Sequence, residues 1–184
     1  MDKYGILAVI FSPTVIALVT IFLVLRGHGS ASDWVVSLSC VVIIPILPVI
    51  MLAAAKKTDL GVSDQAQRTP LLILAVLSYL AGFLFFQLRG FWEMKFVTLS
   101  YATVTLGVTV INALYTKSSI HMAGITGPST ILVLLGFKEG ILLFLLSPIV
   151  AWVRLKVRAH DKLQIALGGG IAVILTVLSY LLCS

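Results

Sequence analysis

The sequence predicts an all-α protein, a membrane bundle of six to seven transmembrane helices that forms one domain over residues 1–184. Hydrophobic residues make up 60% of the chain and charged residues only 11%, whereas soluble domains are roughly half apolar and about a quarter charged. Several uncharged runs have the length, about 20 residues, that crosses a bilayer. Short charged patches separate these runs, and no repeat or long linker divides the sequence.

Five continuous apolar runs and one divided stretch account for the predicted helices. The first run ends without a signal-peptide cleavage site, so we expect a retained helix. The divided stretch is too long for one helix and has Lys138 and Glu139 near its middle, so two short helices joined by a tight turn are expected. In chain order the runs cover residues 6–25, 34–55, 71–88, 96–115, 122–153 (divided) and 164–183.

With seven spans, the connections alternate between two faces of a membrane. One face receives the N-terminus and the connections 56–70, 116–121 and 154–163, which carry most of the cations together with His121 and His160. In such a chain a formal net charge of +6 indicates topology signals, anionic head groups or phosphates rather than nucleic acid. We therefore expect an integral, multi-pass protein of the cell membrane or an endomembrane, with the bilayer as partner and no nucleic acid.

Three predicted helices start from this cationic face. Pro70 suits the first turn of one helix, Ser118 and Ser119 suit the N-cap of the next, and in the third His160-Asp161 lies just ahead of Gln164. Each start presents unpaired backbone N–H groups and the positive end of a helix dipole. Three such ends ringed by Arg and Lys predict an anion site. Phosphate is the anion that is bound best by a combination of a guanidinium fork and point charges.

The two histidines on this face indicate phosphoryl transfer rather than binding alone, because imidazole acts as a nucleophile or proton donor near neutral pH. The segment from Lys117 to His121 places a cation, two hydroxyls and an imidazole within about one helical turn. A short loop joins Arg154 to His160. The sequence has no cluster of carboxylates or thiolates with the spacing of a metal site. No metal or other cofactor is expected.

At these residues the sequence resembles the type-2 phosphatidic acid phosphatase superfamily of membrane lipid phosphatases. That family carries three signatures in order: Lys-x6-Arg-Pro, Pro-Ser-Gly-His, and Ser-Arg-x5-His-x3-Asp. The third is the closest match, because Arg154-x5-His160 has the family spacing while Gln164 replaces the Asp. The second is matched in part by Ser118-Ser119-Ile120-His121.

The first signature is degenerate. One residue separates Arg68 from Pro70, and Lys57 lies eleven residues before Arg68 instead of seven. The patterns Lys117-x-Ser-x-His and His-x3-Gln164 fit a divergent branch of the family, in which Lys117 supplies the cation that the first signature lacks.

The resemblance implies a role for each matched residue. His160 attacks phosphorus and forms a phosphohistidine, and His121 protonates the leaving oxygen. Gln164 holds the imidazole of His160 through its amide oxygen but brings no negative charge. The family needs no metal. The residues implied to hold the phosphoryl oxygens are Lys57, Arg68, Lys117, Ser119 and Arg154.

The expected activity is hydrolysis of a lipid phosphate monoester or diphosphate, with a polyprenyl lipid and a phosphatidate-like lipid both open as substrates. Two alternatives stand beside it. The first is a non-catalytic relative that binds anionic lipid, and the replacement of the family Asp by Gln164 keeps this alternative open. A small membrane transporter is disfavoured, since the interiors of the apolar runs carry almost no charge. Singly, the candidate residues also have simpler roles: Lys57 as a topology charge, Arg68 as a helix pair with Asp64, and His121 as an interfacial cap.

Overall fold

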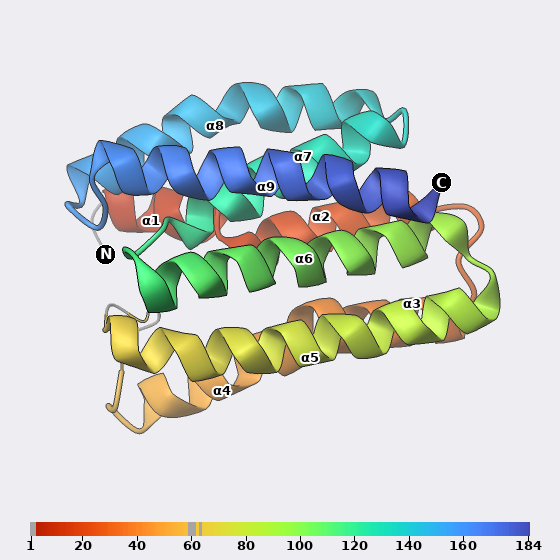
Figure 1. Ribbon diagram of the computed structural model, residues 1–184, viewed down its shortest axis with the longest axis horizontal. Coiled ribbons are helices and arrows are strands. Elements are labelled where there is room, and N and C mark those ends of the chain that lie inside the picture. Colours follow the sequence, from red (N-terminus) through yellow and green to blue (C-terminus); the bar gives the residue numbers. More distant parts are fainter. Residues whose placement is uncertain (1–2, 59–61, 63) are drawn as a thin grey trace.

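The computed structural model describes residues 3–58, 62 and 64–184, with side chains described from residue 5 onward. Every regular element in this part of the chain is helical, so the all-α bundle predicted from the sequence is confirmed. The helices lie side by side along the long axis of the molecule, and their connections gather at two opposite ends (Figure 1).

The first apolar run forms two helices, α1 (Lys3–Ile10) and α2 (Pro13–Leu25), where one was expected. The break comes at Ser12 and Pro13. Proline has no backbone N–H to continue the α1 hydrogen-bond ladder, but it fits the first position of a new helix. The Ser12 hydroxyl caps α2 by accepting a hydrogen bond from the Val15 N–H at 3.3 Å.

The second run is a continuous helix made of α3 (Ala31–Ser37), the π-helical segment η1 (Leu38–Ile43) and α4 (Ile44–Ala54). It begins three residues before the predicted start, because Ser30 and Asp33 form a capping box there. The wider turn of η1 leads into Pro45, whose missing N–H cannot take part in an α-helical ladder.

Two long helices follow, α5 (Gln65–Arg89) and α6 (Trp92–Leu114). They are joined at Gly90, whose φ of 67° suits glycine. Asp64 caps α5 through a 3.0 Å hydrogen bond from the Ala66 N–H. The prediction that Pro70 lies in the first turn is therefore wrong: α5 begins five residues earlier, and Pro70 lies inside it.

The divided stretch forms a hairpin of α7 (Ile120–Leu134) and α8 (Lys138–Lys156), as predicted. The turn comes slightly earlier than expected, at Gly136 with φ 83°, and Lys138 and Glu139 lie in the first turn of α8. The last helix, α9 (Lys162–Cys183), runs back between α7 and α6 (Figure 1).

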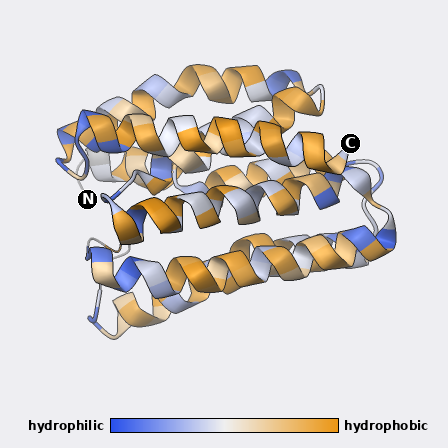
Figure 2. Ribbon diagram, in the orientation of Figure 1, coloured by the Kyte–Doolittle hydropathy of each residue, from blue (hydrophilic) through white to orange (hydrophobic). Residues whose placement is uncertain are grey.

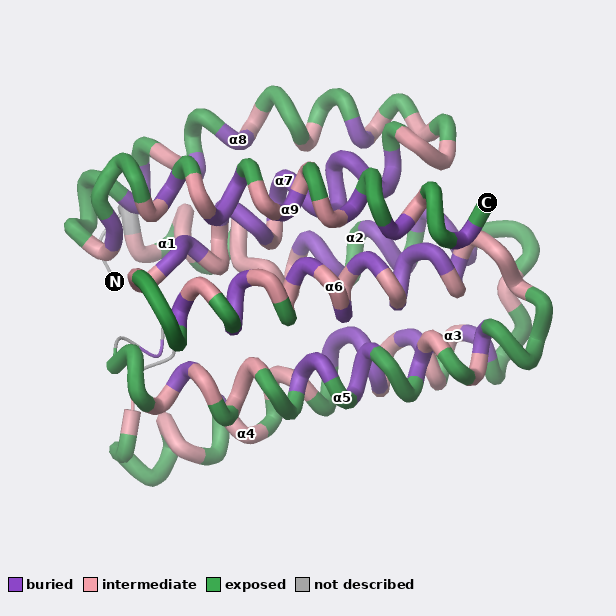
Figure 3. The backbone as a smooth tube through the Cα atoms, in the orientation of Figure 1, coloured by how far each residue is buried: buried purple, intermediate pink, exposed green. Residues whose placement is uncertain are grey.

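Five helical stretches in the described residues are long and apolar enough to cross a membrane. Figure 2 shows hydrophobic residues along most of the length of the helices and hydrophilic residues gathered mainly at the two ends of the bundle. Buried residues lie mainly on the helix faces turned toward the centre, with Phe86, Met94 and Phe96 fully enclosed (Figure 3). The five stretches are Gly5–Leu25, Ala31–Ala54, Gln65–Arg89, Trp92–Leu114 and Lys162–Cys183.

Candidate functional site

The polar end that holds the candidate residues is formed by the α4–α5, α6–α7 and α8–α9 connections, as the sequence predicted (Figure 1). Ser119 ends the second of these connections and caps α7. Its Oγ accepts a hydrogen bond from the Met122 N–H at 3.4 Å, which satisfies one of the unpaired donors at the helix start. The Ser119 N–H donates to the backbone carbonyl of Gln164 at 3.0 Å. Of the two serines predicted as the N-cap, Ser119 is the one that caps α7, and its backbone N–H joins the start of α7 to the start of α9.

Close packing of α9 against this cap depends on Gly168. A Cβ at Gly168 would lie 3.0 Å from the backbone N and 3.1 Å from the carbonyl C of Ser119, and closer still to its O. Real Cβ atoms essentially never come as close as this contact with the Ser119 O, and the other two contacts are tighter than nine in ten real ones. Glycine is therefore required for the α7 cap and the first turns of α9 to meet.

Hydrogen bonds fix both ends of the α8–α9 connection. Ala159 donates its N–H to the carbonyl of Arg154 at 3.1 Å, which closes the end of α8. Asp161 and Gln164 then form a capping box at the start of α9: the Gln164 N–H donates to Asp161 Oδ1 at 2.8 Å, and the Asp161 N–H donates to Gln164 Oε1 at 3.4 Å. This box turns the Gln164 side chain back toward the connection.

The side chain of Gln164 sets the tautomer of His160. His160 Nδ1 lies 3.0 Å from Gln164 Oε1. The other end of the amide, Nε2, donates to Thr116 Oγ1 at 3.2 Å, so Oε1 is the acceptor and Nδ1 carries the proton. A neutral imidazole protonated at Nδ1 has its lone pair on Nε2. Within the described part of the chain, His160 Nε2 is buried and has no hydrogen-bond partner.

The surroundings of His160 keep it neutral. The residue is 7% exposed, and burial is the main reason that its pKa falls from the usual 6.5 to about 4. Repulsion from Arg68, Arg154 and Lys117 lowers the pKa further, while the hydrogen bond to Gln164 acts in the opposite direction. Near pH 7 the imidazole therefore offers a free lone pair inside a positively charged site.

The two arginines reach the site from different helices. Arg68, near the start of α5, is 3% exposed; its Nε donates to the carbonyl of Val62 at 2.6 Å and its Nη1 to that of Ser118 at 3.4 Å. Arg154 is buried in the last turn of α8. His121, in the first turn of α7, is half-buried and interacts electrostatically with Arg154, His160 and Arg68.

The structure thus brings together most of the residues predicted from the sequence. Lys57 is the exception, because it is exposed and borders a separate small hollow beside Pro70, not the cavity lined by Arg68, His121 and Arg154. Sequence reasoning missed Thr116 as the partner of the Gln164 amide. The Asp161-x2-Gln164 capping pattern was visible in the sequence, but nothing in it indicated a hydroxyl partner for the amide.

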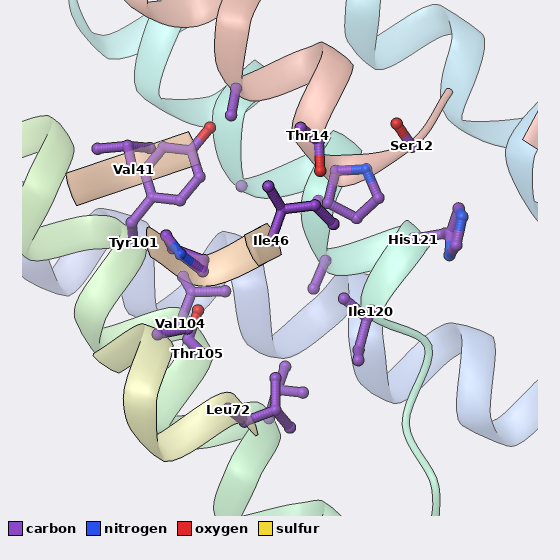
Figure 4. Close-up of a pocket in the computed structure, with 18 of the residues that line it drawn as sticks. Ser12, Thr14, Val41, Ile46, Leu72, Tyr101, Val104, Thr105, Ile120 and His121 are labelled. Atoms are coloured by element: carbon purple, nitrogen blue, oxygen red, sulfur yellow. The ribbon is translucent and has the colours of Figure 1, made fainter. Parts of the chain in front are cut away.

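A cavity of about 910 Å³ opens beside the site between α2, η1, α4, α5, α6 and α7. Its volume is at the upper end of the range for ligand pockets, roughly 300–1,000 Å³. Most of its lining is apolar, and its basic residues are Arg68, His121 and Arg154. His160 is not one of the lining residues. Figure 4 shows His121 and Ile120 at one edge of the cavity, with Tyr101 and Val41 across from them.

Comparisons of the chain with protein-family models, with curated proteins and with solved structures found no match.

Proposed function

We propose that the protein is an integral, multi-pass membrane phosphatase that hydrolyses a lipid phosphate monoester or diphosphate, with His160 as nucleophile. One observation carries the proposal: His160 Nδ1 is held by Gln164 while the buried Nε2 has no partner in the described residues. A structural histidine has no need of a vacant lone pair surrounded by cations, whereas a nucleophile requires both.

The reaction proceeds in two displacements. The Nε2 lone pair of His160 forms a P–N bond as the P–O bond to the lipid breaks, and His121, which enters this step as imidazolium, gives its proton to the leaving oxygen and becomes neutral. Water then attacks phosphorus, its proton passes to His121, and the P–N bond breaks to release inorganic phosphate and restore His160. The electron pair of each broken bond leaves with the departing oxygen or nitrogen, so both histidines return to their starting states.

The cations supply the electrostatic part of catalysis. Phosphoryl transfer depends mainly on positioning and on compensating the charge of the equatorial oxygens. Arg68, Arg154 and Lys117 all act electrostatically on His160, so a phosphoryl group bound at Nε2 experiences the same positive charges. Buried arginines suit this role because their planar forks stay charged and bind two oxygens at once.

Lipid is favoured as the substrate class by the surroundings of the site. In the described part of the chain, five helical stretches are long and apolar enough to cross a membrane, and the cavity that contains Arg68, His121 and Arg154 is otherwise largely apolar. A polyprenyl phosphate or diphosphate and a phosphatidate-like lipid both combine an anionic head with hydrocarbon. Both therefore belong in the first assay.

The test is phosphate release by the purified protein in liposomes that contain a polyprenyl phosphate, a polyprenyl diphosphate or phosphatidate. His160→Ala is expected to abolish release, and His28→Ala, an exposed substitution at the opposite end, to leave it unchanged. Vanadate is expected to inhibit, and a chelator to have no effect. Full activity of His160→Ala, or loss on chelation alone, contradicts the proposal. Lipid binding by the wild type without any turnover would favour the non-catalytic alternative.

A further inference from the structure

The cavity extends from the cationic end deep into the bundle. On α7 its lining runs from His121 to Ile131, ten residues that correspond to about 15 Å of helix. That is about half of the roughly 30 Å hydrocarbon core of a bilayer. The cavity is therefore an elongated space with its charged groups at one end and apolar groups along most of its length.

One wall of the cavity is the continuous helix of η1 and α4. Its lining residues recur at the spacing of one helical face, so a whole apolar stripe is turned toward the cavity. Over the most apolar part of Ala31–Ala54, only 11% of the residues are buried inside the protein. Most of this helix is therefore exposed on the outside of the bundle, and its inner stripe faces a cavity of matching polarity. The stripe consists of Val41, Val42, Pro45, Ile46, Val49 and Ile50.

We propose that the cavity binds a single hydrocarbon chain of a lipid phosphate, with the phosphate at Arg68, His121 and Arg154 and the chain directed along α7 toward Ile131. The charges at one end select an anionic head group. The apolar lining selects hydrocarbon over sugar or nucleotide, because those would leave polar groups buried without partners. The chain is thus held inside the protein, and its length becomes a determinant of specificity. The fate of the phosphate rests on the proposed function, but chain binding does not.

Two small lining positions allow the length of the site to be changed. Ala75 on α5 is buried and lies seven residues after Arg68, about 10 Å along the helix, so Ala75→Leu closes the inner part of the cavity. Ala81→Leu makes the same change on an exposed face of α5. On α6, Val104→Leu narrows the cavity from the other side, and Val110→Leu, at an exposed position, is its control.

The experiment measures binding of linear alkyl phosphates of increasing length to the His160→Ala protein in nanodiscs, by displacement of a fluorescent alkyl phosphate. Affinity is expected to rise with chain length until the cavity is filled, and then to level off. In Ala75→Leu the affinity should level off at a shorter chain length. Long-chain alkyl phosphates should bind about tenfold more weakly than to the parent protein, and the affinity for short-chain ones should change little. Thermal unfolding of each variant checks that it is folded. If Ala75→Leu does not fold, Val104→Leu provides a second test of the dependence on chain length.

Identical length profiles for the cavity variants and their exposed controls would overturn the inference. So would affinity that is independent of chain length. These outcomes are distinguishable from failure of the proposed function. Phosphate release without a length effect in any variant would support the phosphatase activity and contradict the chain-binding site. Length-dependent binding without phosphate release would support the chain-binding site and contradict the phosphatase activity.

Discussion

His160 Nδ1 lies 3.0 Å from the amide oxygen of Gln164, four residues later in the chain. An amide oxygen in this position accepts the Nδ1 proton and fixes the tautomer just as a carboxylate would, but it adds no charge that favours imidazolium. Burial of His160, with the repulsion from its cationic neighbours, therefore outweighs the hydrogen bond to Gln164, and its pKa falls to about 4.

Replacing Gln164 by Glu tests this relationship, because the two side chains have nearly the same shape and Glu also fits the third position of a capping box. A carboxylate beside the imidazole is expected to raise the pKa of His160 by about 1 to 3 units. The acid limb of the pH–rate profile, where the nucleophile becomes protonated, should move to higher pH by a similar amount. NMR titration of the imidazole measures the same shift without activity.

Gln164→Leu is the matched variant that removes the hydrogen bond to His160, since leucine keeps the approximate size of the side chain but offers no acceptor. We expect kcat to fall about 100-fold or more, because the tautomer and orientation of a catalytic base or nucleophile are lost with its partner. An unchanged pH profile in Gln164→Glu together with full activity in Gln164→Leu would show that the contact has no catalytic role.

Acid is expected to destabilise the protein through His160. The pKa of His160 in the folded state, about 4, is below its ordinary value of 6.5. Between these two pH values His160 is therefore protonated in the unfolded chain and neutral in the folded chain. The stabilisation is complete above about pH 6.5 and is lost as the pH falls toward 4, at up to about 1.4 kcal/mol per pH unit. Unfolding temperatures measured across this range should show a shallower slope for His160→Gln than for the wild type or His28→Ala.

The contact between Gly168 and Ser119 predicts a sharp difference between two neighbouring glycines. Gly168→Ala places a Cβ against the Ser119 backbone and is expected to destabilise the protein by about 1 to 3 kcal/mol and to reduce activity. At Gly170 a Cβ meets nothing within 4 Å. Gly170→Ala is therefore expected to stabilise α9 by about 0.5 to 1 kcal/mol. Chemical denaturation of both variants gives the comparison, and equal effects would exclude the close packing.

Thr116 is expected to act by positioning Gln164. Thr116→Val removes the acceptor of the Gln164 Nε2 hydrogen bond and keeps the shape of the side chain, so a loss of about 1 kcal/mol of orientation energy should lower kcat several-fold with little change in KM. Thr116→Ser retains the hydroxyl and should retain most of the activity. A loss that appears equally in both variants points to packing instead of hydrogen bonding.

Fold class and the grouping of the polar connections were predictable from the sequence because both depend on local composition. Apolar runs of spanning length predict helices wherever they occur, and alternation of the connections places His121, Arg154 and His160 at one end. Breaks inside a run were harder to locate. The two helices on either side of Ser12 are both apolar, and only the short Ser12-Pro13 signal marks the division.

The sequence by itself determined the helical class, the cationic end and the spacing of Arg154, His160 and Gln164, since these follow from residues close together in the chain. Only the tertiary structure decided that Thr116 holds the far end of the Gln164 amide, that Lys57 lies apart from the histidines, and that the cationic end continues into an apolar cavity. Those features join residues from different helices. They depend on how closely the helices pack, as at Gly168 and Ser119, and on the spaces left between them, which no local pattern specifies.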